Sequence, residues 1–302
     1  QSEQDFYTTK TIDKMWKFLT RRHLVYEKDG AQWLKTSEYG DSEDRVVMTQ
    51  QGVFTYLMSD IAYLYDRFTT RKFDRAIVIV GADHHGYIDR WQAAAEILGY
   101  KGKLEVIVTQ LVRVVRGGQE VRVSKRRGTF ITLKDVVDDI GIDEARYFFV
   151  SRDFNTHMDI DLDLAKEHST KNPIYYIQYA NARITSVLAK IKNKKSSSIE
   201  NKSAGKTRNK GSFRDGLYNN ERALIKKLLI FPELITDIAA SYEVHRLAFY
   251  TLEVADAFHK FYETARVIGD EREGERILLV KATQIVLGRA LRLMGIEPVE
   301  SM

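Results

Sequence analysis

The sequence predicts an α/β part followed by a bundle of helices, and three observations lead to this fold class. The chain has 302 residues, which is long for a single core and favours two domains. Between residues 76 and 112, the runs AIVIV, GADHHG, IDRWQAAAEILGY and KLEVIVTQLV read as strand, loop, helix and strand, a parallel β-α-β unit. Past about residue 131 the apolar residues recur only at helical spacing.

We therefore expect an α/β part over 1-130, a connecting helical region over 131-171 and an all-α bundle over 172-302. In a parallel sheet, ligands bind at the carboxyl ends of the strands. The GADHHG loop lies at that end of the first strand, which makes it a candidate site.

The elements before residue 76 follow from local patterns. Apolar residues predict a helix over 11–22 with Thr11 as its cap. The turn Asp29-Gly30 inside VYEKDGAQWL predicts a β-hairpin. A second strand pair, RVVMT and VFTYL, is expected around a QQG turn, and Ser59 is expected to cap a short helix, DIAYLYDRF.

The elements after residue 131 are expected to be helical throughout. One helix is predicted over 133–149, and Asn172-Pro173 is a favourable helix start. Three more helices are expected over roughly 219–240, 242–267 and 273–295.

The net charge of +5 comes from one segment. Residues 190–214 contain nine Lys or Arg against the single acid Glu200, so the rest of the chain is net acidic. A solvated insertion between helices is one interpretation of this segment, and contact with an acidic polymer is the other. The chain has no cysteine, which excludes disulfides and thiolate metal sites. No apolar run approaches the roughly 18 residues of a membrane span.

The acid and imidazoles of Asp83-His84-His85 permit three interpretations. Both residue types bind metals, but a metal phosphoesterase would need further ligands on other strand ends. A loop that contacts a nucleotide is the second interpretation. The third is a purely structural loop.

Tyr56 and Asp60 in YLMSDIAY form a second candidate site. Asp60 could be a first-turn aspartate stabilised by the helix dipole, with Tyr56 as a core aromatic residue. A carboxylate near a phenol in a cleft would also suit a guanidinium group. Spacing alone leaves both interpretations open.

The third candidate is the stretch EVRVSKRRGTF, residues 120–130, where four basic residues precede one glycine. A mobile cationic loop at this point would suit a triphosphate whose charge grows during attack. An exposed run of charge is the alternative.

Several stretches together resemble the C-terminal part of a bacterial-type arginyl-tRNA synthetase, a class I enzyme. VRVSKRRGTF resembles the KMSKS loop, and GADHHGYIDRWQAAAEILGY resembles the segment beside ATP. RYFFVSRDFNTHMDIDLDLAKEHSTKNPIYYIQYANARI resembles the junction into the anticodon-binding domain, and FYETARVIGD and MGIEPVESM resemble the closing helices. The resemblance spans essentially the whole chain. It implies a partial Rossmann-like catalytic domain followed by an anticodon-binding bundle.

The resemblance also implies roles for single residues. Tyr56 and Asp60 match positions that bind arginine, with Asp60 reading the guanidinium. Ser124 and Lys125 match the catalytic, phosphate-stabilising loop. The ATP-binding positions are Gly81, Asp83, His84, His85, Arg122 and Lys125. Two departures are that Ala82 stands where some members have Gln, and that Arg122 and Val123 replace the first Lys and Met of the loop.

For the tRNA, the resemblance implies contacts along the first helix of the bundle. The matching residues are Tyr175, Tyr176, Gln178, Tyr179 and Arg183. Aromatic rings at a surface can stack on unpaired anticodon bases, whereas buried rings would be core.

By resemblance, the enzyme would join arginine and ATP, with Mg²⁺ and no tightly bound metal, and charge tRNA-Arg as a cytoplasmic monomer. The family's His-Ile-Gly-His signature is absent from these residues, and we take the start at Gln1 as a sign that an N-terminal part has been removed. The chain alone is therefore expected to be inactive but able to bind tRNA. The alternatives are a stand-alone RNA-binding or regulatory module, and a metal hydrolase that uses Asp83 and His85.

Overall fold

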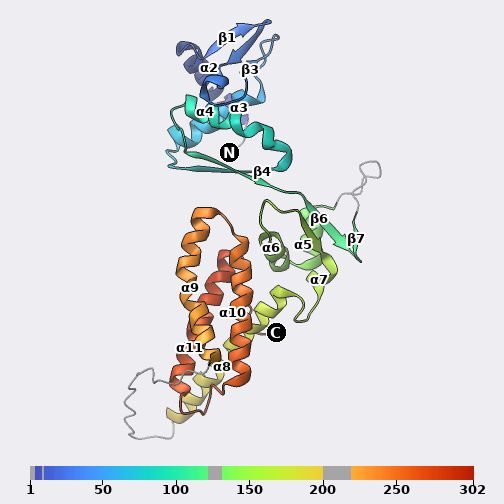
Figure 1. Cartoon of the computed structure of the whole chain (residues 1–302), viewed down its shortest axis with the longest axis vertical. Coiled ribbons are helices and arrows are strands. Elements are labelled where there is room, and N and C mark those ends of the chain that lie inside the picture. Colours follow the sequence, from blue (N-terminus) through green and yellow to red (C-terminus); the bar gives the residue numbers. More distant parts are fainter. Residues whose placement is uncertain (1–3, 9, 122–130, 200–218) are drawn as a thin grey trace. The chain divides into compact units, whose positions relative to one another are not determined.

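The computed structural model describes residues 4–8, 10–121, 131–199 and 219–302 and divides the chain into two compact units (Figure 1). The first unit is Gln1–Leu111 and the second is Val112–Met302. The predicted limit at residue 130 lies outside the described residues. The division into 1-130, 131-171 and 172-302 therefore stays a prediction.

The first unit begins with helices and a small antiparallel sheet. The predicted helix is α2 (Thr11–Arg21), and Lys10 precedes it in a left-handed conformation in place of a Thr11 cap. The predicted hairpin is confirmed, because Asp29 and Gly30 both have positive φ, 53° and 74°. The other elements here are α1 (Gln4–Thr8), β1 (Val25–Lys28), β2 (Ala31–Leu34), η1 (Thr36–Tyr39) and β3 (Arg45–Met48), with sheet order β1-β2-β3.

The predicted partner strand of β3 is reduced to one bridge between Met48 and Phe54. Helix α3 (Tyr56–Tyr65) begins immediately after Thr55, and Ser59 is buried in its interior, so the predicted cap at Ser59 is wrong. The reason is that the consecutive residues Leu57 and Met58 are both buried, whereas an edge strand would place them on opposite faces. A π-helical turn, η2 (Asp66–Thr70), continues α3.

The predicted β-α-β unit is confirmed. β4 (Ala76–Gly81) and β5 (Leu104–Thr109) are parallel, and η3 (Ala82–Tyr87) and α4 (Ile88–Ile97) connect them. The strand β4 is only partly buried, because Ile79 is 67% exposed. The core of the unit lies among α2, α3 and α4, around Met15, Leu19, Leu34, Met58 and Ile61.

The second unit starts with a sheet that the sequence analysis missed. β6 (Val112–Arg116) pairs with β7 (Gln119–Glu120) and, in parallel, with β8 (Met158–Asp161). The expectation of helices only after residue 131 is therefore wrong at β8. The predicted helix over 133–149 is two helices, α5 (Leu133–Ile140) and α6 (Ile142–Val150), because Gly141 has a φ of 95° that ends the first. Helix α7 (Leu162–Lys166) follows β8.

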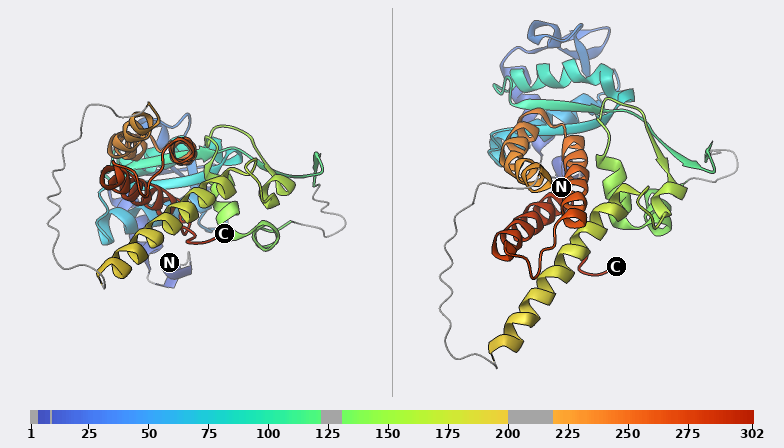
Figure 2. Two further views of the ribbon diagram at one scale, coloured as in Figure 1. Left: turned by 90° about the horizontal axis from the view of Figure 1, so that it is seen from below. Right: turned by 60° about the horizontal axis from the view of Figure 1, so that its bottom comes forward.

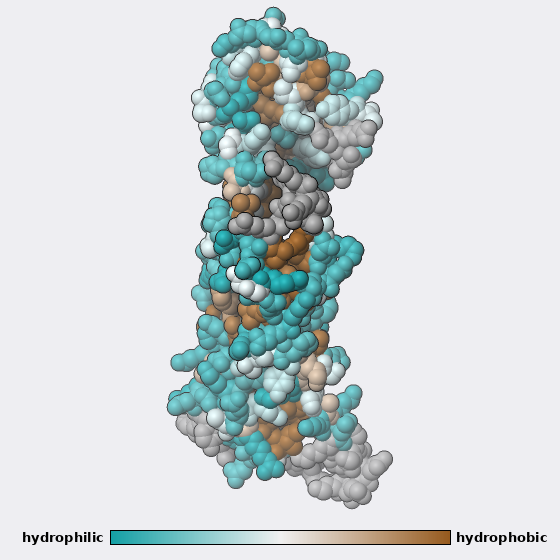
Figure 3. All heavy atoms as spheres, turned by 90° about the vertical axis from the view of Figure 1, so that its right-hand side faces the viewer, coloured by the Kyte–Doolittle hydropathy of each residue, from teal (hydrophilic) through white to brown (hydrophobic). Residues whose placement is uncertain are grey.

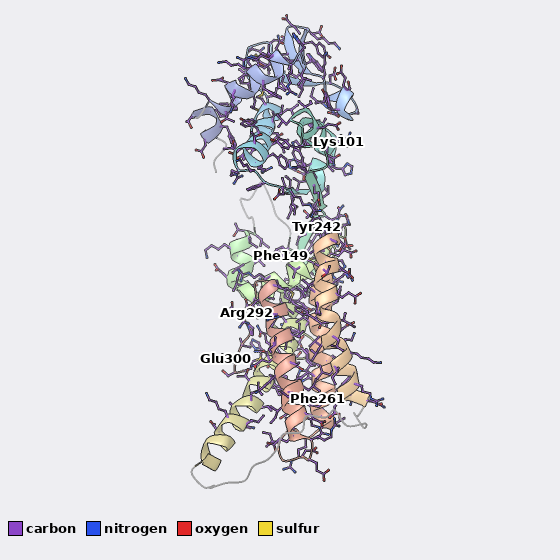
Figure 4. All side chains as sticks on the ribbon, turned by 90° about the vertical axis from the view of Figure 1, so that its left-hand side faces the viewer. Lys101, Phe149, Tyr242, Phe261, Arg292 and Glu300 are labelled. Atoms are coloured by element: carbon purple, nitrogen blue, oxygen red, sulfur yellow. The ribbon has the colours of Figure 1, made fainter. Side chains whose placement is uncertain are left out.

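In the described part of the second unit, four long helices form the bundle that the sequence predicts (Figures 1 and 2). They are α8 (Pro173–Ile199), α9 (Asn219–Ser241), α10 (His245–Thr264) and α11 (Glu273–Leu293). Helix α8 begins at Pro173 as expected. The side-chain amide of Asn172, however, donates to the Ala165 carbonyl and does not cap the helix. Phe261, labelled in Figure 4, belongs to the core between these helices and has no exposed surface.

The surface seen in Figure 3 is mainly hydrophilic, with separate apolar patches over both units. Among the described residues, none of the helices combines the length and apolar character needed to cross a membrane. The basic segment 190–214 lies largely outside the described residues, although α8 runs into its first part.

Candidate functional site

Tyr56 and Asp60 line one pocket of about 270 Å³ in the first unit. They lie one helical turn apart on α3 and therefore face the same side. Tyr56 is 83% exposed and not a core residue, and Asp60 is the fifth residue of α3, so its placement in the first turn was wrong. The pocket, called here the Tyr56 pocket, is lined by Arg45, Val46, Thr55, Tyr56, Leu57, Asp60, Tyr87 and Arg90.

Two arginines in the Tyr56 pocket have different partners. Arg45 donates from Nε and a terminal nitrogen to the buried Asp41 carboxylate, at 2.8 and 2.7 Å, and also contacts Glu43. The bidentate hydrogen bond from Arg45 lowers the pKa of Asp41. Arg90 instead lies over the Tyr87 ring, 4.3 Å from its centroid.

Trp91 fixes the carboxylate of Asp60. Its indole Nε1 donates to Asp60 Oδ2 at 2.8 Å, across 31 residues of sequence. Asp60 and Trp91 also border a second pocket of about 190 Å³, where burial lowers the pKa of Arg67. Asp60 therefore lines both pockets, and Trp91 of α4 sets the orientation of its carboxylate.

The loop with Gly81, Asp83, His84 and His85 lies at the carboxyl ends of β4 and β5, as predicted. Gly81 pairs with Thr109 in the parallel register. A Cβ atom on Gly81 would lie 2.7 Å from Asp83 Oδ1, a contact that the exposed Asp83 side chain could relieve by moving. Asp83, His84 and His85 are exposed.

His84 lies beside the Tyr56 pocket. Its ring packs against Tyr87, with centroids 5.6 Å apart, and Tyr87 is itself a lining residue of that pocket. The loop and the Tyr56 pocket are therefore neighbours.

Arg122, Ser124 and Lys125 lie outside the described residues, so their assignment to ATP and its phosphates stays a prediction. In the part of the chain that the structure describes, no group of three or more His, Asp or Glu side chains could hold a metal ion. His84 Nε2 lies 3.6 Å from Asp83 Oδ2.

Helix α8 contributes to an aromatic cluster with α10 in the second unit. Arg183 lies over the rings of Tyr179 and Tyr262, 4.5 and 5.1 Å from their centroids. It also contacts Nδ1 of His259 at 3.2 Å, and its other terminal nitrogen donates to the Tyr179 hydroxyl. These residues and Tyr176 are called here the Arg183 cluster. Tyr179 is 36% exposed, so the cluster reaches the surface.

His259 is the buried centre of the Arg183 cluster. It is 4% exposed and packs against the rings of Tyr176 and Tyr179 at centroid distances of 4.5 and 5.5 Å. Burial lowers the pKa of His259, and the Arg183 charge lowers it further. A neutral imidazole can accept from Arg183 at Nδ1 while its Nε2 faces the Tyr176 carbonyl at 3.5 Å.

Gln178 and Tyr175 lie apart from the Arg183 cluster. Gln178 is 6% exposed, donates to the Glu297 carbonyl and accepts from the Val299 amide. It therefore holds the C-terminal segment against α8. The Tyr175 ring packs edge-on against His168.

The sequence analysis missed Arg90 and Trp91 in the first unit and His259 and Tyr262 in the second. For the second pair, a signal existed, because His259 and Tyr262 are three residues apart and share a helix face. For Trp91 no local pattern indicates Asp60 as its partner.

Two family models match the chain. The model described as "tRNA synthetases class I (R), catalytic domain" matches residues 2–186. The model described as "DALR anticodon binding domain" matches residues 177–302.

Curated relatives include the arginine–tRNA ligases of Bacillus subtilis and Halalkalibacterium halodurans, each 41% identical over the whole chain. The chain spans 53% of the length of these relatives. An arginyl-tRNA synthetase structure from Campylobacter jejuni is 33% identical with a TM-score of 0.86, over 100% of this chain and 64% of that one. The Thermus thermophilus arginyl-tRNA synthetase shares the fold, at 21% identity and a TM-score of 0.72, over 97% of this chain and 58% of that one.

Proposed function

Because the chain belongs to the class I arginyl-tRNA synthetase family, we propose that it supplies the arginine pocket and the tRNA-reading bundle of an arginine–tRNA ligase. Such an enzyme joins arginine and ATP into arginyl-adenylate, releases pyrophosphate and passes the arginyl group to the terminal ribose of tRNA-Arg. The observation that carries the proposal is that Tyr56 and Asp60 line a single pocket.

In this proposal Asp60 accepts hydrogen bonds from the guanidinium of the substrate. A carboxylate reads a guanidinium well because both are planar and oppositely charged. Trp91 holds the Asp60 carboxylate in one orientation before the substrate arrives, which reduces the ordering cost of binding. Tyr56, which lines the pocket and is largely exposed, would lie along the aliphatic part of the substrate.

The neighbouring loop of Gly81, Asp83, His84 and His85 is the proposed nucleotide side. ATP would enter with its Mg²⁺, and Arg122, Ser124 and Lys125 would stabilise the triphosphate as its charge develops. The Arg183 cluster is the proposed tRNA contact, in which the Tyr179 ring stacks on an unpaired base. Gln178, which the resemblance assigned to tRNA, would act through the C-terminal segment that it holds. We also propose that the protein is a cytoplasmic monomer.

Calorimetric titration of the chain with L-arginine and L-citrulline tests the arginine pocket. Citrulline has the same shape but a neutral ureido group, so we expect it to bind at least about tenfold more weakly. Asp60→Asn should remove this preference, whereas Asp74→Asn, an exposed acid in the same unit, should keep it. Equal affinity of the unmodified chain for the two amino acids would contradict the proposal.

Fluorescence anisotropy with a hairpin RNA that carries an arginine anticodon loop tests the bundle. Tyr179→Ala should weaken binding by about 1 to 3 kcal/mol, the range for one base stacked on an aromatic ring. Tyr7→Ala, which removes a similarly exposed ring from the first unit, is the control. Equal binding of a hairpin with a scrambled loop would show that the bundle does not read the anticodon.

A stand-alone RNA-binding module is the alternative function. It would need the Arg183 cluster but not a pocket that selects arginine over citrulline. The calorimetric titration therefore separates the two functions.

A further inference from the structure

Arg90 has a buried donor without an acceptor. Its Nε atom is inaccessible to solvent and has no hydrogen-bond partner among the described residues. The guanidinium is held on the Tyr87 ring, which orients the group but does not satisfy its N–H donors. Buried donors in native proteins nearly always have a partner, so this donor is able to take an acceptor from a bound molecule once the guanidinium turns toward the pocket.

The charges around the Tyr56 pocket point to the kind of ligand. Arg45 is compensated, because Asp41 and Glu43 both form ion pairs with it. Within the described ranges, Arg90 has no carboxylate at ion-pair distance, whereas Asp60 lines the same pocket. The pocket thus contains one acid and one uncompensated guanidinium, which suits a ligand with a cation and an oxyanion.

We propose that Arg90 forms an oxyanion subsite in the Tyr56 pocket, opposite in charge to the guanidinium reader Asp60. The oxyanion is either the carboxylate of the amino acid or a phosphate of the nucleotide part. The inference rests on the proposed function in one respect, since it takes arginine as the ligand that Asp60 binds. Arginine and its adenylate each carry both charges, so either one satisfies Asp60 and Arg90 together.

The carboxylate source is tested with L-arginine and L-argininamide, which has a neutral amide in place of the carboxylate. We expect the unmodified chain to bind arginine about 10- to 100-fold more tightly, the range for one charge-assisted hydrogen bond. Arg90→Met keeps an unbranched side chain but removes the guanidinium, and it should bring the ratio close to about one. The control is Lys101→Met, which removes a positive charge from an exposed side chain of the same unit (Figure 4).

The phosphate source is tested by protection from thermal unfolding with AMP and with inorganic phosphate. If Arg90 binds phosphate, both should raise the melting temperature of the unmodified chain, and Arg90→Met should remove the increase. Arg90→Lys keeps a positive charge on a group of different shape. It should therefore keep part of the preference for arginine over argininamide, or part of the phosphate protection. It also serves as the second variant should Arg90→Met fail to fold.

The outcomes separate the two proposals. Two results together would overturn the oxyanion subsite. The ratio of the affinities for arginine and argininamide would stay unchanged in Arg90→Met and Arg90→Lys, and any rise in melting temperature with AMP or phosphate would not depend on Arg90. If arginine, citrulline and argininamide all fail to bind, the arginine pocket fails, and the phosphate arm alone then decides the role of Arg90. If Asp60→Asn binds arginine and citrulline equally but still binds arginine more tightly than argininamide, both the arginine pocket and the oxyanion subsite are supported.

Discussion

At the scale of single residues, both candidate sites hold a guanidinium on an aromatic ring. Arg90 lies over Tyr87, and Arg183 lies over Tyr179. A ring fixes the plane of a guanidinium but leaves its positive charge uncompensated, so the group remains able to bind an anion. Arg45 shows the contrast, because two carboxylates neutralise it.

Trp91→Phe tests the orientation of Asp60. The variant keeps an aromatic ring but removes the indole donor to Oδ2, so arginine affinity should fall by about 1 kcal/mol, roughly fivefold. Calorimetric titration measures this change. Trp33→Phe removes a comparable indole hydrogen bond in the hairpin and should leave the affinity unaltered; an equal loss in both variants would assign the effect to general destabilisation.

His259 should make stability depend on pH. Burial lowers its folded-state pKa below the ordinary value of 6.5, so between these two values only the unfolded chain binds the proton. Stability is therefore lost as pH falls from about 6.5 toward the folded pKa, by at most about 1.4 kcal/mol per pH unit. Urea unfolding between about pH 7.5 and 5.5 measures the slope.

His259→Asn should flatten that slope, and because the Asn carbonyl can replace Nδ1 as the acceptor for Arg183, it should retain RNA binding near neutral pH. His157→Asn, at an exposed position, should keep the original slope. A slope that survives in His259→Asn would place the titration at another residue.

At the scale of elements, a network of ion pairs connects the start of α9 with the start of α11. Glu221, 1% exposed, accepts from Arg276 Nε at 2.8 Å and from Arg272 at 2.7 Å. Arg276 is 4% exposed and also pairs with Asp270 at 2.9 Å. Because Glu221 and Arg276 are away from water, each depends on its partners.

Glu221→Gln should therefore destabilise the second unit by about 3 kcal/mol, the lower end of the range for a broken buried pair. Glu253→Gln is the matched control, since Glu253 joins α10 to α9 through Lys227 but is 55% exposed. Its cost should stay below about 1 kcal/mol. Chemical unfolding of both variants measures the difference, and similar costs would mean that water reaches the Glu221 network.

The elements also show where local sequence patterns were sufficient. Asp29-Gly30 specified the hairpin, because only turn residues with positive φ close two strands so tightly. The end of α5 at Gly141 was not predicted, because the apolar spacing continues past this residue. Periodicity alone does not reveal a single backbone angle. The strand β8 was missed because its pairing with β6 joins segments that are 46 residues apart, as between Arg113 and Asp159.

At the scale of the whole molecule, we expect no ATP/pyrophosphate exchange by the 302-residue chain. The reason is that the His-Ile-Gly-His signature, which the family uses to hold ATP, is absent from its sequence. The exchange assay with arginine and an arginine tRNA measures this. Any turnover above that of an Asp60→Asn control would contradict the expectation.

The sequence by itself determined the family, the order of an α/β part and a helical bundle, and the residues Tyr56, Asp60, Tyr179 and Arg183 as candidates. These features are carried by short patterns, in which hydrophobic period, turn residues and motif spacing act over a few positions. Only the tertiary structure decided which side chains complete each site. Trp91 reaches Asp60 across 31 residues and His259 reaches Arg183 across 76, and such contacts depend on how whole helices pack.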